Sequence, residues 1–190
     1  LDDGLSRFSI EFTDPLISDL EVGASVAING VCLSVTDLCG NTISFDAVRE
    51  TLELSNLKSI QVGTMVNIER SMKYNSEVGG HVVSGHIMGT VPVSSVEMTP
   101  NNWRINFSVP KDWLRYLFNK GFIAINGASL TIAAVNHQAN EFAVNLIPET
   151  LRTTNFPLLS AGDNVNIEID SQTQTIVETV ERVLAEKSKR

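Results

Sequence analysis

The chain has 190 residues, of which 43% are apolar and 19% are charged, enough apolar residues to form buried cores. Its 14 Lys and Arg against 22 Asp and Glu give a net charge of −8, which argues against a surface for nucleic acid or anionic lipid. No stretch approaches the roughly 20 apolar residues of a membrane span. With two cysteines, no CxxC pair and no signal-peptide pattern, we expect a soluble protein of the reducing cytoplasm.

The chain contains two copies of one sequence pattern. Residues 27–35 read AINGVCLSV and residues 124–132 read AINGASLTI, so Asn29 aligns with Asn126 at an offset of 97 residues (126 − 29). The match extends in both directions. Before this motif, SRFSIEF matches WRINFSV, and after it RETLELSNL matches PETLRTTNF and VGTMVNIE matches AGDNVNIE. After the central hairpin the offset becomes 99 residues, and the two extra residues fit a longer hairpin loop in the second copy.

Each copy is predicted to consist of short strands and one brief helical segment, near Leu16 in the first copy and near Trp113 in the second. Alternating apolar residues such as Val26 and Ile28, broken by Gly and Asn turns, favour a small closed β-barrel. The stretch SGHIMGTVPV (84–93) opens the second copy, and its counterpart would lie before residue 1. The sequence therefore predicts an N-terminal barrel over residues 1–78 that lacks its first strand, and a C-terminal barrel over residues 79–170.

Residues 171–190 are predicted to form one amphipathic helix. Apolar residues recur there at helical spacing, and Ser171 and Gln174 suggest a capping box. These apolar residues are Ile176, Val177, Val180, Val183 and Leu184. The stripe must cover either the chain's own barrels or another subunit. We favour a contact between subunits, because the helix follows two domains that are already self-contained.

The stretch GGHVVSGH (79–86) is a candidate ligand site. His81 and His86 are five residues apart, a spacing that suits neither an HExxH helix nor a zinc site, so no metal is expected. Glycines in this stretch could let the backbone approach a ligand while one imidazole binds it or moves protons. The alternative is a Gly-rich linker between domains with surface histidines.

The repeat also aligns Cys32 with Ser129 and Ser34 with Thr131, which predicts small polar side chains facing a pocket in both barrels. Packing on a strand is the alternative for these residues. The stretches DAVRET (46–51) and NLIPET (145–150) place a turn after a strand, where backbone groups could read the edge of a planar heterocycle. Glu50 and Glu149 could equally cap the following helical turn, and Asp170 is the default N-cap of the C-terminal helix. A twofold pocket suggests two similar ligands.

Taken together, VAINGVCLSVT, GGHVVSGHIMGT, GASLTI, LIPETL and VNIEID resemble the riboflavin synthase family, which includes lumazine- and flavin-binding antenna proteins. The resemblance runs from about residue 7 to residue 184. It implies an all-β fold of two tandem Greek-key six-stranded barrels with a C-terminal α-helix, assembled as a homotrimer. Each barrel would bind one 6,7-dimethyl-8-ribityllumazine, and the reaction would convert two of these molecules into riboflavin and 5-amino-6-(D-ribitylamino)uracil without cofactor or metal. A non-catalytic antenna is the alternative, and an association with lumazine synthase is left open.

The resemblance also implies an active site between the first barrel of one subunit and the second barrel of its neighbour, with Lys120 reaching toward the neighbour's ligand. The catalytic residues it implies are Cys32, His86, Ser129, Thr131 and Asp170. The substrate-binding residues it implies are Ser25, Cys32, Leu33, Ser34, Asp46, Ala47, Val48, Arg49, Glu50, Thr51, Gly85, His86, Ile87, Lys120, Ser129, Leu130, Thr131, Leu146, Ile147, Pro148, Glu149 and Thr150.

Overall fold

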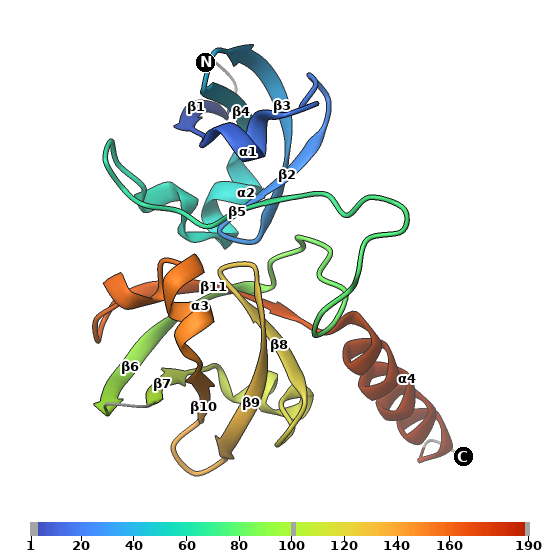
Figure 1. Cartoon of the computed structure of the whole chain (residues 1–190). Coiled ribbons are helices and arrows are strands. Elements are labelled where there is room, and N and C mark those ends of the chain that lie inside the picture. Colours follow the sequence, from blue (N-terminus) through green and yellow to red (C-terminus); the bar gives the residue numbers. More distant parts are fainter. Residues whose placement is uncertain (1–3, 100–101, 189–190) are drawn as a thin grey trace.

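The computed structural model describes residues 4–99 and 102–188. It has two β units, one from each copy of the repeat, and the helix α4 (Ser171–Lys187), which projects from the second unit (Figure 1). The ends of the predicted segments, residues 1–3 and 189–190, lie outside the described residues. The predicted all-β fold of two repeated units with a C-terminal helix is confirmed.

The second unit is a closed antiparallel barrel with the strand order β10-β7-β6-β11-β8-β9. Its strands are β6 (Gly89–Thr99), β7 (Asn102–Ser108), β8 (Phe122–Ile125), β9 (Ala128–Asn136), β10 (Glu141–Leu146) and β11 (Asn164–Ile169). Between them lie the short helices η2 (Lys111–Tyr116), α3 (Pro148–Thr153) and η3 (Phe156–Leu158). Inward-facing aliphatic and aromatic side chains, among them Ile105, Phe107 and Phe142, fill the barrel and are fully buried or nearly so.

The first unit is a five-stranded sheet with the order β1-β4-β3-β2-β5. Its strands are β1 (Leu5–Glu11), β2 (Ser25–Ile28), β3 (Val31–Cys39), β4 (Thr42–Val48) and β5 (Ile68–Arg70), accompanied by α1 (Asp14–Ile17), α2 (Arg49–Leu54) and η1 (Asn56–Ser59). Every strand of this sheet has a counterpart in the second unit, in the same order. Within the described residues the first unit is therefore not a closed six-stranded barrel, and the strand it lacks is the counterpart of β6, as the repeat predicts.

The two units meet at their Asn-Gly hairpin turns. Asn29 and Gly30 have φ of 45° and 80°, and Asn126 and Gly127 have φ of 44° and 84°. Positive φ at both central residues defines the type I′ turn that joins two antiparallel strands tightly. A Cβ atom on Gly30 would lie 2.5 Å from the backbone nitrogen of Gly127. Both glycines are therefore needed for the two turns to touch back to back.

Around these turns, six asparagines link the units in a nearly symmetric network. They form three pairs that are equivalent in the repeat: Asn29 and Asn126, Asn56 and Asn155, Asn67 and Asn166. The Asn67 side chain donates to the backbone carbonyl of Asn126 (2.9 Å), and the Asn166 side chain donates to that of Asn29 (2.8 Å). Most of these bonds are matched by an equivalent bond from the other unit, so the units are related by a pseudo-twofold axis. The exceptions are the bonds that the Asn56 side-chain oxygen accepts from Asn29 and Asn166, because the side-chain oxygen of Asn155 has no hydrogen-bond partner in the described part of the chain.

Helix α4 begins at Ser171 and is capped by Asp170, whose carboxylate accepts hydrogen bonds from the Thr173 amide (2.9 Å) and hydroxyl (2.6 Å). The predicted capping box is wrong, because Ser171 is already inside the helix and the Gln174 side chain donates to Glu178 instead. Asp170 is the N-cap because its carboxylate accepts these hydrogen bonds and its negative charge is also stabilised by the helix dipole.

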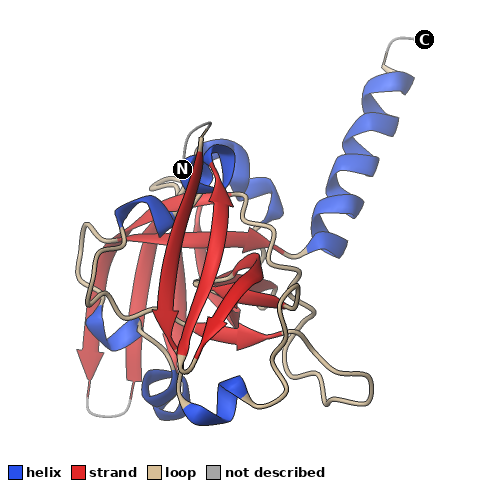
Figure 2. Cartoon of the chain, turned by 90° about the horizontal axis from the view of Figure 1, so that it is seen from above, coloured by secondary structure: helices blue, strands red, loops and turns tan. Residues whose placement is uncertain are grey.

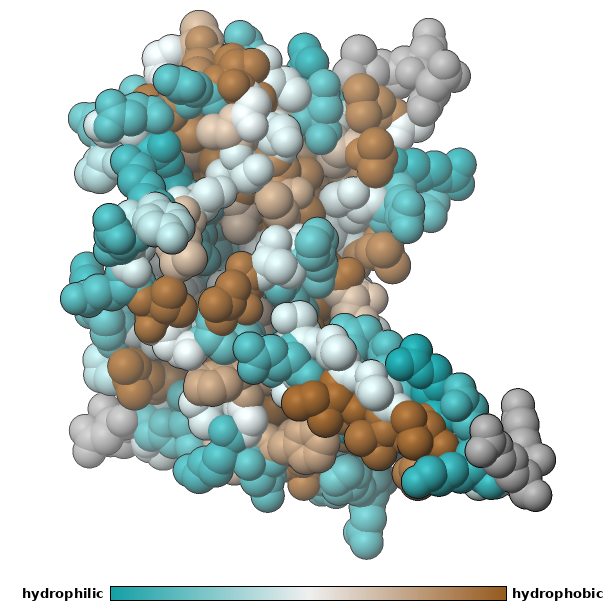
Figure 3. All heavy atoms as spheres, turned by 90° about the vertical axis from the view of Figure 1, so that its right-hand side faces the viewer, coloured by the Kyte–Doolittle hydropathy of each residue, from teal (hydrophilic) through white to brown (hydrophobic). Residues whose placement is uncertain are grey.

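The helix leaves most of its apolar stripe exposed. Val177 packs against the barrel core, but Ile176, Val180, Val183 and Leu184 are 63%, 52%, 42% and 58% exposed. Figure 2 shows α4 projecting away from the β units, and Figure 3 shows apolar side chains along one of its faces. Among the described helices, none is both long and apolar enough to cross a membrane.

Candidate functional site

The small polar residues of β3 and β9 lie on the outer faces of the two units. Side chains alternate along a strand, so Leu33 and Leu130 point inward and are 7% and 8% exposed, and their neighbours point outward. Those outward neighbours are Cys32 and Ser34 on β3, and Ser129 and Thr131 on β9. For Leu33 and Leu130, only the backbone is left to contact a ligand on the outer face.

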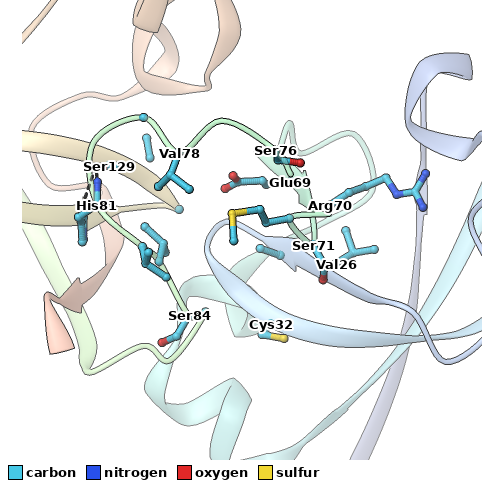
Figure 4. Close-up of a pocket in the computed structure, with 18 of the residues that line it drawn as sticks. Val26, Cys32, Glu69, Arg70, Ser71, Ser76, Val78, His81, Ser84 and Ser129 are labelled. Atoms are coloured by element: carbon cyan, nitrogen blue, oxygen red, sulfur yellow. Dashed lines mark hydrogen bonds between the residues drawn. The ribbon is translucent and has the colours of Figure 1, made fainter. Parts of the chain in front are cut away.

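A cleft of about 540 Å³ lies between the two units. One wall comes from the first unit, with Val26, Cys32 and Glu69, and the other from the second unit, with Ser129. The connecting segment 76–85 crosses it (Figure 4). The cleft brings together three of the predicted site residues, Cys32, Gly85 and Ser129, and so places the equivalent thiol and hydroxyl of the two copies in one cavity.

His81 is bonded to Ser129 inside this cleft. Its Nδ1 lies 2.7 Å from the Ser129 hydroxyl, and its backbone amide donates to the same oxygen (3.2 Å). The imidazole stacks on Phe122 with ring centroids 5.3 Å apart, and its buried Nε2 has no hydrogen-bond partner in the part of the chain that is described. Burial lowers the pKa of His81, although the carboxylates of Asp170 and Glu168 oppose the shift. At neutral pH the ring is therefore uncharged and able to accept a proton.

Glu168 fixes the loop that enters the second barrel. Its buried carboxylate accepts hydrogen bonds from the Ser84 amide (2.7 Å), the Ser84 hydroxyl (2.7 Å) and the Gly85 amide (2.9 Å). The Gly85 carbonyl in turn accepts from the Cys32 amide (3.1 Å). A Cβ atom on Gly85 would lie 2.4 Å from the Cys32 Cβ, so glycine is required for this contact. The loop thus ties Cys32 of one unit to a carboxylate of the other.

His86 and Ile87 lie just beyond this loop. The exposed His86 ring places Nδ1 3.1 Å from the Ser84 hydroxyl, but His86 does not line the cleft. Ile87 packs partly buried against the core of the first unit. The structure therefore brings His81, rather than His86, into contact with Ser129.

The predicted residues at the strand ends occupy equivalent places in both units, away from the cleft. Ala47 and Leu146 are buried, whereas Val48 and Ile147 are 53% and 63% exposed where β4 and β10 end. Arg49, Glu50 and Thr51 begin α2, and Pro148, Glu149 and Thr150 begin α3. Neither helix has a side-chain cap. Three of the four charged residues form ion pairs: Asp46 with Arg7 on the paired strand β1, Arg49 with Glu53, and Glu149 with Arg152.

Three further predicted residues lie at the edges of the site. Lys120 is exposed, with φ of 69°, at the turn that leads into β8. The Ser25 carbonyl accepts a hydrogen bond from the Ser71 hydroxyl (2.8 Å). Burial raises the pKa of Asp170, but the hydrogen bonds from Thr173 outweigh this effect and the net shift is downward. Asp170 is therefore an ionised helix cap next to the cleft.

A family model for the lumazine binding domain matches residues 2–71 and 84–170 of the chain. The two matched segments are the two units described above. The chain belongs to the lumazine binding domain family.

Relatives within this family cover nearly the whole chain. The riboflavin synthase of Escherichia coli (strain K12) is 49% identical over 177 residues, which are 93% of this chain and 82% of that protein. The riboflavin synthase of Chlamydia pneumoniae is 40% identical over 186 residues, which are 98% of this chain and 90% of that protein. Among solved structures, LumP complexed with riboflavin superimposes with a TM-score of 0.81 at 26% identity, covering 90% of this chain and 91% of that one.

Some residues of this candidate site were not predicted from the sequence. His81 enters the sequence-based predictions only as one of two histidines in GGHVVSGH, and these predictions assign no role in the site to Glu168 or to the asparagines. The repeat contained a signal for the latter, since NIE occurs at 67–69 and again at 166–168. A polar Asn-x-Glu pair that recurs within strands otherwise rich in Val and Ile indicates buried hydrogen-bond partners.

Within the described residues, no group of three or more His, Cys, Asp or Glu side chains could hold a metal ion.

Proposed function

We propose that the chain is a riboflavin synthase, which converts two molecules of 6,7-dimethyl-8-ribityllumazine into riboflavin and 5-amino-6-(D-ribitylamino)uracil. One lumazine gives a four-carbon unit to the other, so the atoms of the two substrates equal those of the two products and no oxidant is consumed. The observation that carries the proposal is the repeat itself: two equivalent units, each with a small polar pair on its outer face, provide for two identical ligands. The similarity to riboflavin synthases supports the same conclusion.

The chemistry asks the protein mainly to orient two rings and to move protons. An exocyclic methyl group of this ring system is unusually acidic, so a neutral base near it is sufficient to start the reaction. His81 has this character, because its imidazole is uncharged at neutral pH and its Nε2 has no partner within the described residues. Ser129, held by His81, provides a hydroxyl to the same ligand.

The two units must differ so that one lumazine acts as donor and the other as acceptor. The copies differ where Cys32 stands opposite Ser129 and where Ser34 stands opposite Thr131. A thiol is a weaker hydrogen-bond donor than a hydroxyl and has a different acidity. We assign the asymmetry of the reaction to these substitutions, together with His86 and Asp170 beside the cleft.

The decisive experiment is incubation of the protein with the lumazine alone. Riboflavin and the pyrimidinedione are expected in equal amounts. The second candidate is a non-catalytic antenna, favoured by the superposition on LumP in complex with riboflavin. A stable fluorescent complex with no turnover would establish the antenna and refute the enzyme.

Assembly as a homotrimer in the cytoplasm completes the proposal. The exposed stripe on α4 is suited to contact the same stripe of neighbouring subunits, and an active site shared between subunits would then include Lys120 of a neighbour. An association with lumazine synthase would deliver the substrate directly. Co-sedimentation of the two proteins tests that association, and independent sedimentation would remove it.

A further inference from the structure

His86 is linked through one serine to a buried carboxylate. Its ring Nδ1 lies 3.1 Å from the hydroxyl oxygen of Ser84, and that hydroxyl donates to Oε1 of Glu168 (2.7 Å). Glu168 is 5% exposed and belongs to β11, whereas His86 is exposed. A chain of hydrogen bonds therefore runs from Glu168 inside the second unit, through Ser84, to an imidazole on the surface.

The direction of these hydrogen bonds follows from what each group can donate. The Glu168 carboxylate has no hydrogen to give, and it also accepts from the amides of Ser84 (2.7 Å) and Gly85 (2.9 Å). The Ser84 hydroxyl gives its single hydrogen to Glu168, so its oxygen is left to accept from the His86 ring. Nδ1 of His86 then carries the hydrogen. Only one nitrogen of a neutral imidazole is protonated, so Nε2 of His86 is an acceptor.

His81 has no such directed arrangement. Its Nδ1 also meets a serine hydroxyl, that of Ser129, whose oxygen accepts from the His81 amide. No carboxylate takes the hydrogen of the Ser129 hydroxyl within residues 4–99 and 102–188, so either tautomer of His81 satisfies this contact. Of the two histidines in GGHVVSGH, His86 is therefore the one whose tautomer the structure fixes.

The segment that carries His86 is fastened to the first unit, although Glu168 belongs to the second. The Gly85 carbonyl accepts from the Cys32 amide (3.1 Å), and Ile87 packs against the core of the first unit. His86 lies between these two contacts. The exposed ring is thus held beside β3, the strand from which Cys32 points outward.

We propose that Glu168 and Ser84 are positioning residues that fix His86 as the Nδ1–H tautomer, and so present its Nε2 as an acceptor to the lumazine on the first unit. The catalytic part of this inference rests on the proposed function, whereas the tautomer does not. When a proton moves from the lumazine to Nε2, the electron pair stays on the lumazine and the ring becomes a cation. Nδ1 keeps its bond to Ser84, and the negative charge of Glu168 beyond that hydroxyl favours the cation.

Nuclear magnetic resonance reads the tautomer directly. Long-range proton–nitrogen spectra of protein labelled with nitrogen-15 at histidine, recorded at about pH 8 where an ordinary imidazole is neutral, distinguish protonated from bare ring nitrogens. The chain has 3 histidines, and the spectrum of the His86→Gln variant identifies the signals of His86. A protonated Nδ1 and a bare Nε2 are expected, the reverse of the form that prevails in free histidine. A proton on Nε2 of neutral His86 would overturn the proposal.

Variants of Ser84 connect the tautomer to the reaction. Ser84→Ala removes the hydroxyl but keeps both amide bonds to Glu168, so the loop should stay in place. Signals of both tautomers should then appear for His86, and kcat should fall about threefold to tenfold, in proportion to the lost fraction of the Nδ1–H form. KM for the lumazine should stay within about twofold, because binding is not what the tautomer controls.

A rescue and a control complete this series. Ser84 is exposed, so Ser84→Thr has room for its methyl group and should restore both the tautomer and kcat. Ser188→Ala removes an exposed hydroxyl at the end of α4 and should change neither measurement. An unchanged tautomer in Ser84→Ala, or a loss of kcat that Ser84→Thr does not restore, would overturn the proposal.

The carboxylate is tested by Glu168→Gln. The new NH2 group must face one of the two amide donors, so a bond is lost and both tautomers of His86 should appear. Glu69→Gln is the matched control: Glu69 is the equivalent residue of the first copy, and the Ser84 and Gly85 amides bond to Glu168 instead, so the tautomer should not change. If Glu168→Gln unfolds the loop, the Ser84 variants decide. An Nδ1–H tautomer in a protein that makes no riboflavin would count against the proposed function and not against this hydrogen-bond chain.

Discussion

The Ser129 hydroxyl is held by two hydrogen bonds that the sequence alone does not predict. Its hydroxyl is held by the ring and by the amide of His81, so it is positioned before any ligand arrives. Ser129→Ala should lower turnover while leaving lumazine binding within about tenfold, as expected when an interaction acts mainly in the transition state. Single-turnover kinetics and ligand titration separate the two effects. Equal losses of affinity and rate would show that Ser129 only binds substrate.

Cys32 is the equivalent position in the first copy and provides a matched comparison. Cys32→Ser restores the residue of the second copy, so it should reduce turnover less than Cys32→Ala if a polar contact is needed.

Asp170→Asn should also lower turnover, but with little loss of stability, since asparagine is as good an N-cap as aspartate. A Tm of the Asp170→Asn protein far below that of the parent would mean that the carboxylate is needed for the fold rather than for the reaction.

His81 should give the protein a pH-dependent stability. Its pKa in the folded protein is lowered by burial, whereas in the unfolded chain it titrates near the ordinary value of about 6.5. The unfolded state therefore takes up the proton first, and the stability contributed by a neutral His81 is present above about pH 6.5 and is lost as the pH falls below it. His81→Gln should remove this part of the pH dependence, measured by urea unfolding between about pH 7.5 and 5.5. His86→Gln is the control, and the same flattening in both variants would contradict the assignment.

The two histidines also show where prediction from sequence ends. The motif GGHVVSGH indicated a functional loop, and the loop does enter the cleft. Which imidazole meets Ser129 depends on the path of the backbone through Gly80 and Gly85, both with positive φ, and no local pattern specifies that path. Packing of the loop between two units, which are far apart in the sequence, decides it.

At the scale of elements, α4 carries an apolar stripe that the described part of the chain leaves largely exposed. Deleting residues 172–190 should convert the proposed trimer to a monomer in analytical sedimentation, because the apolar stripe would be lost. Val180→Asp within the stripe should have the same effect, since it would bury a charge at the contact. Thr175→Asp, on another face of the helix, is the matched control. A trimer that survives both the deletion and Val180→Asp would remove α4 from assembly.

The position and length of α4 were predictable, because its apolar residues recur at helical spacing and Asp170 directly follows a strand. Its direction was not predictable. It is set by contacts with η2, in which the Tyr116 hydroxyl donates to Glu178 (2.9 Å) and Arg115 pairs with Glu181 (3.1 Å). Arg115 and Tyr116 lie more than 60 residues before these glutamates, and exposed charges give no signal of such a pairing.

At the scale of the molecule, the internal repeat made most of the fold predictable. It predicted the two units and the strand that the first unit lacks within the described residues, whereas the Greek-key strand order was implied only by the family resemblance. It did not predict how the units meet, because asparagine in a turn is common for reasons of backbone conformation alone. Asn29 and Asn126 serve both purposes: their positive φ makes the turn, and their side chains enter the network between the units.

The asparagine network joins the two units into one body. Asn166 is completely buried; its side chain donates to the carbonyl of Asn29 (2.8 Å) and accepts from the amide of Asn56 (2.6 Å). Asn166→Ala leaves these buried groups without partners, which costs about 1–3 kcal/mol for each group. Its equivalent, Asn67, makes the same two kinds of bond from a half-buried position, so Asn67→Ala should cost less.

Urea unfolding measures the loss of unfolding free energy in both variants. Asn145 is exposed, so Asn145→Ala is the control and should stay within about 0.5 kcal/mol of the parent protein. If the asparagines couple the units, the double variant of Asn67 and Asn166 should unfold in two steps, because each unit has its own core and the coupling between them is weakened. A single transition in the double variant, with losses no larger than that of Asn145→Ala, would mean that the turns and apolar contacts alone hold the units together.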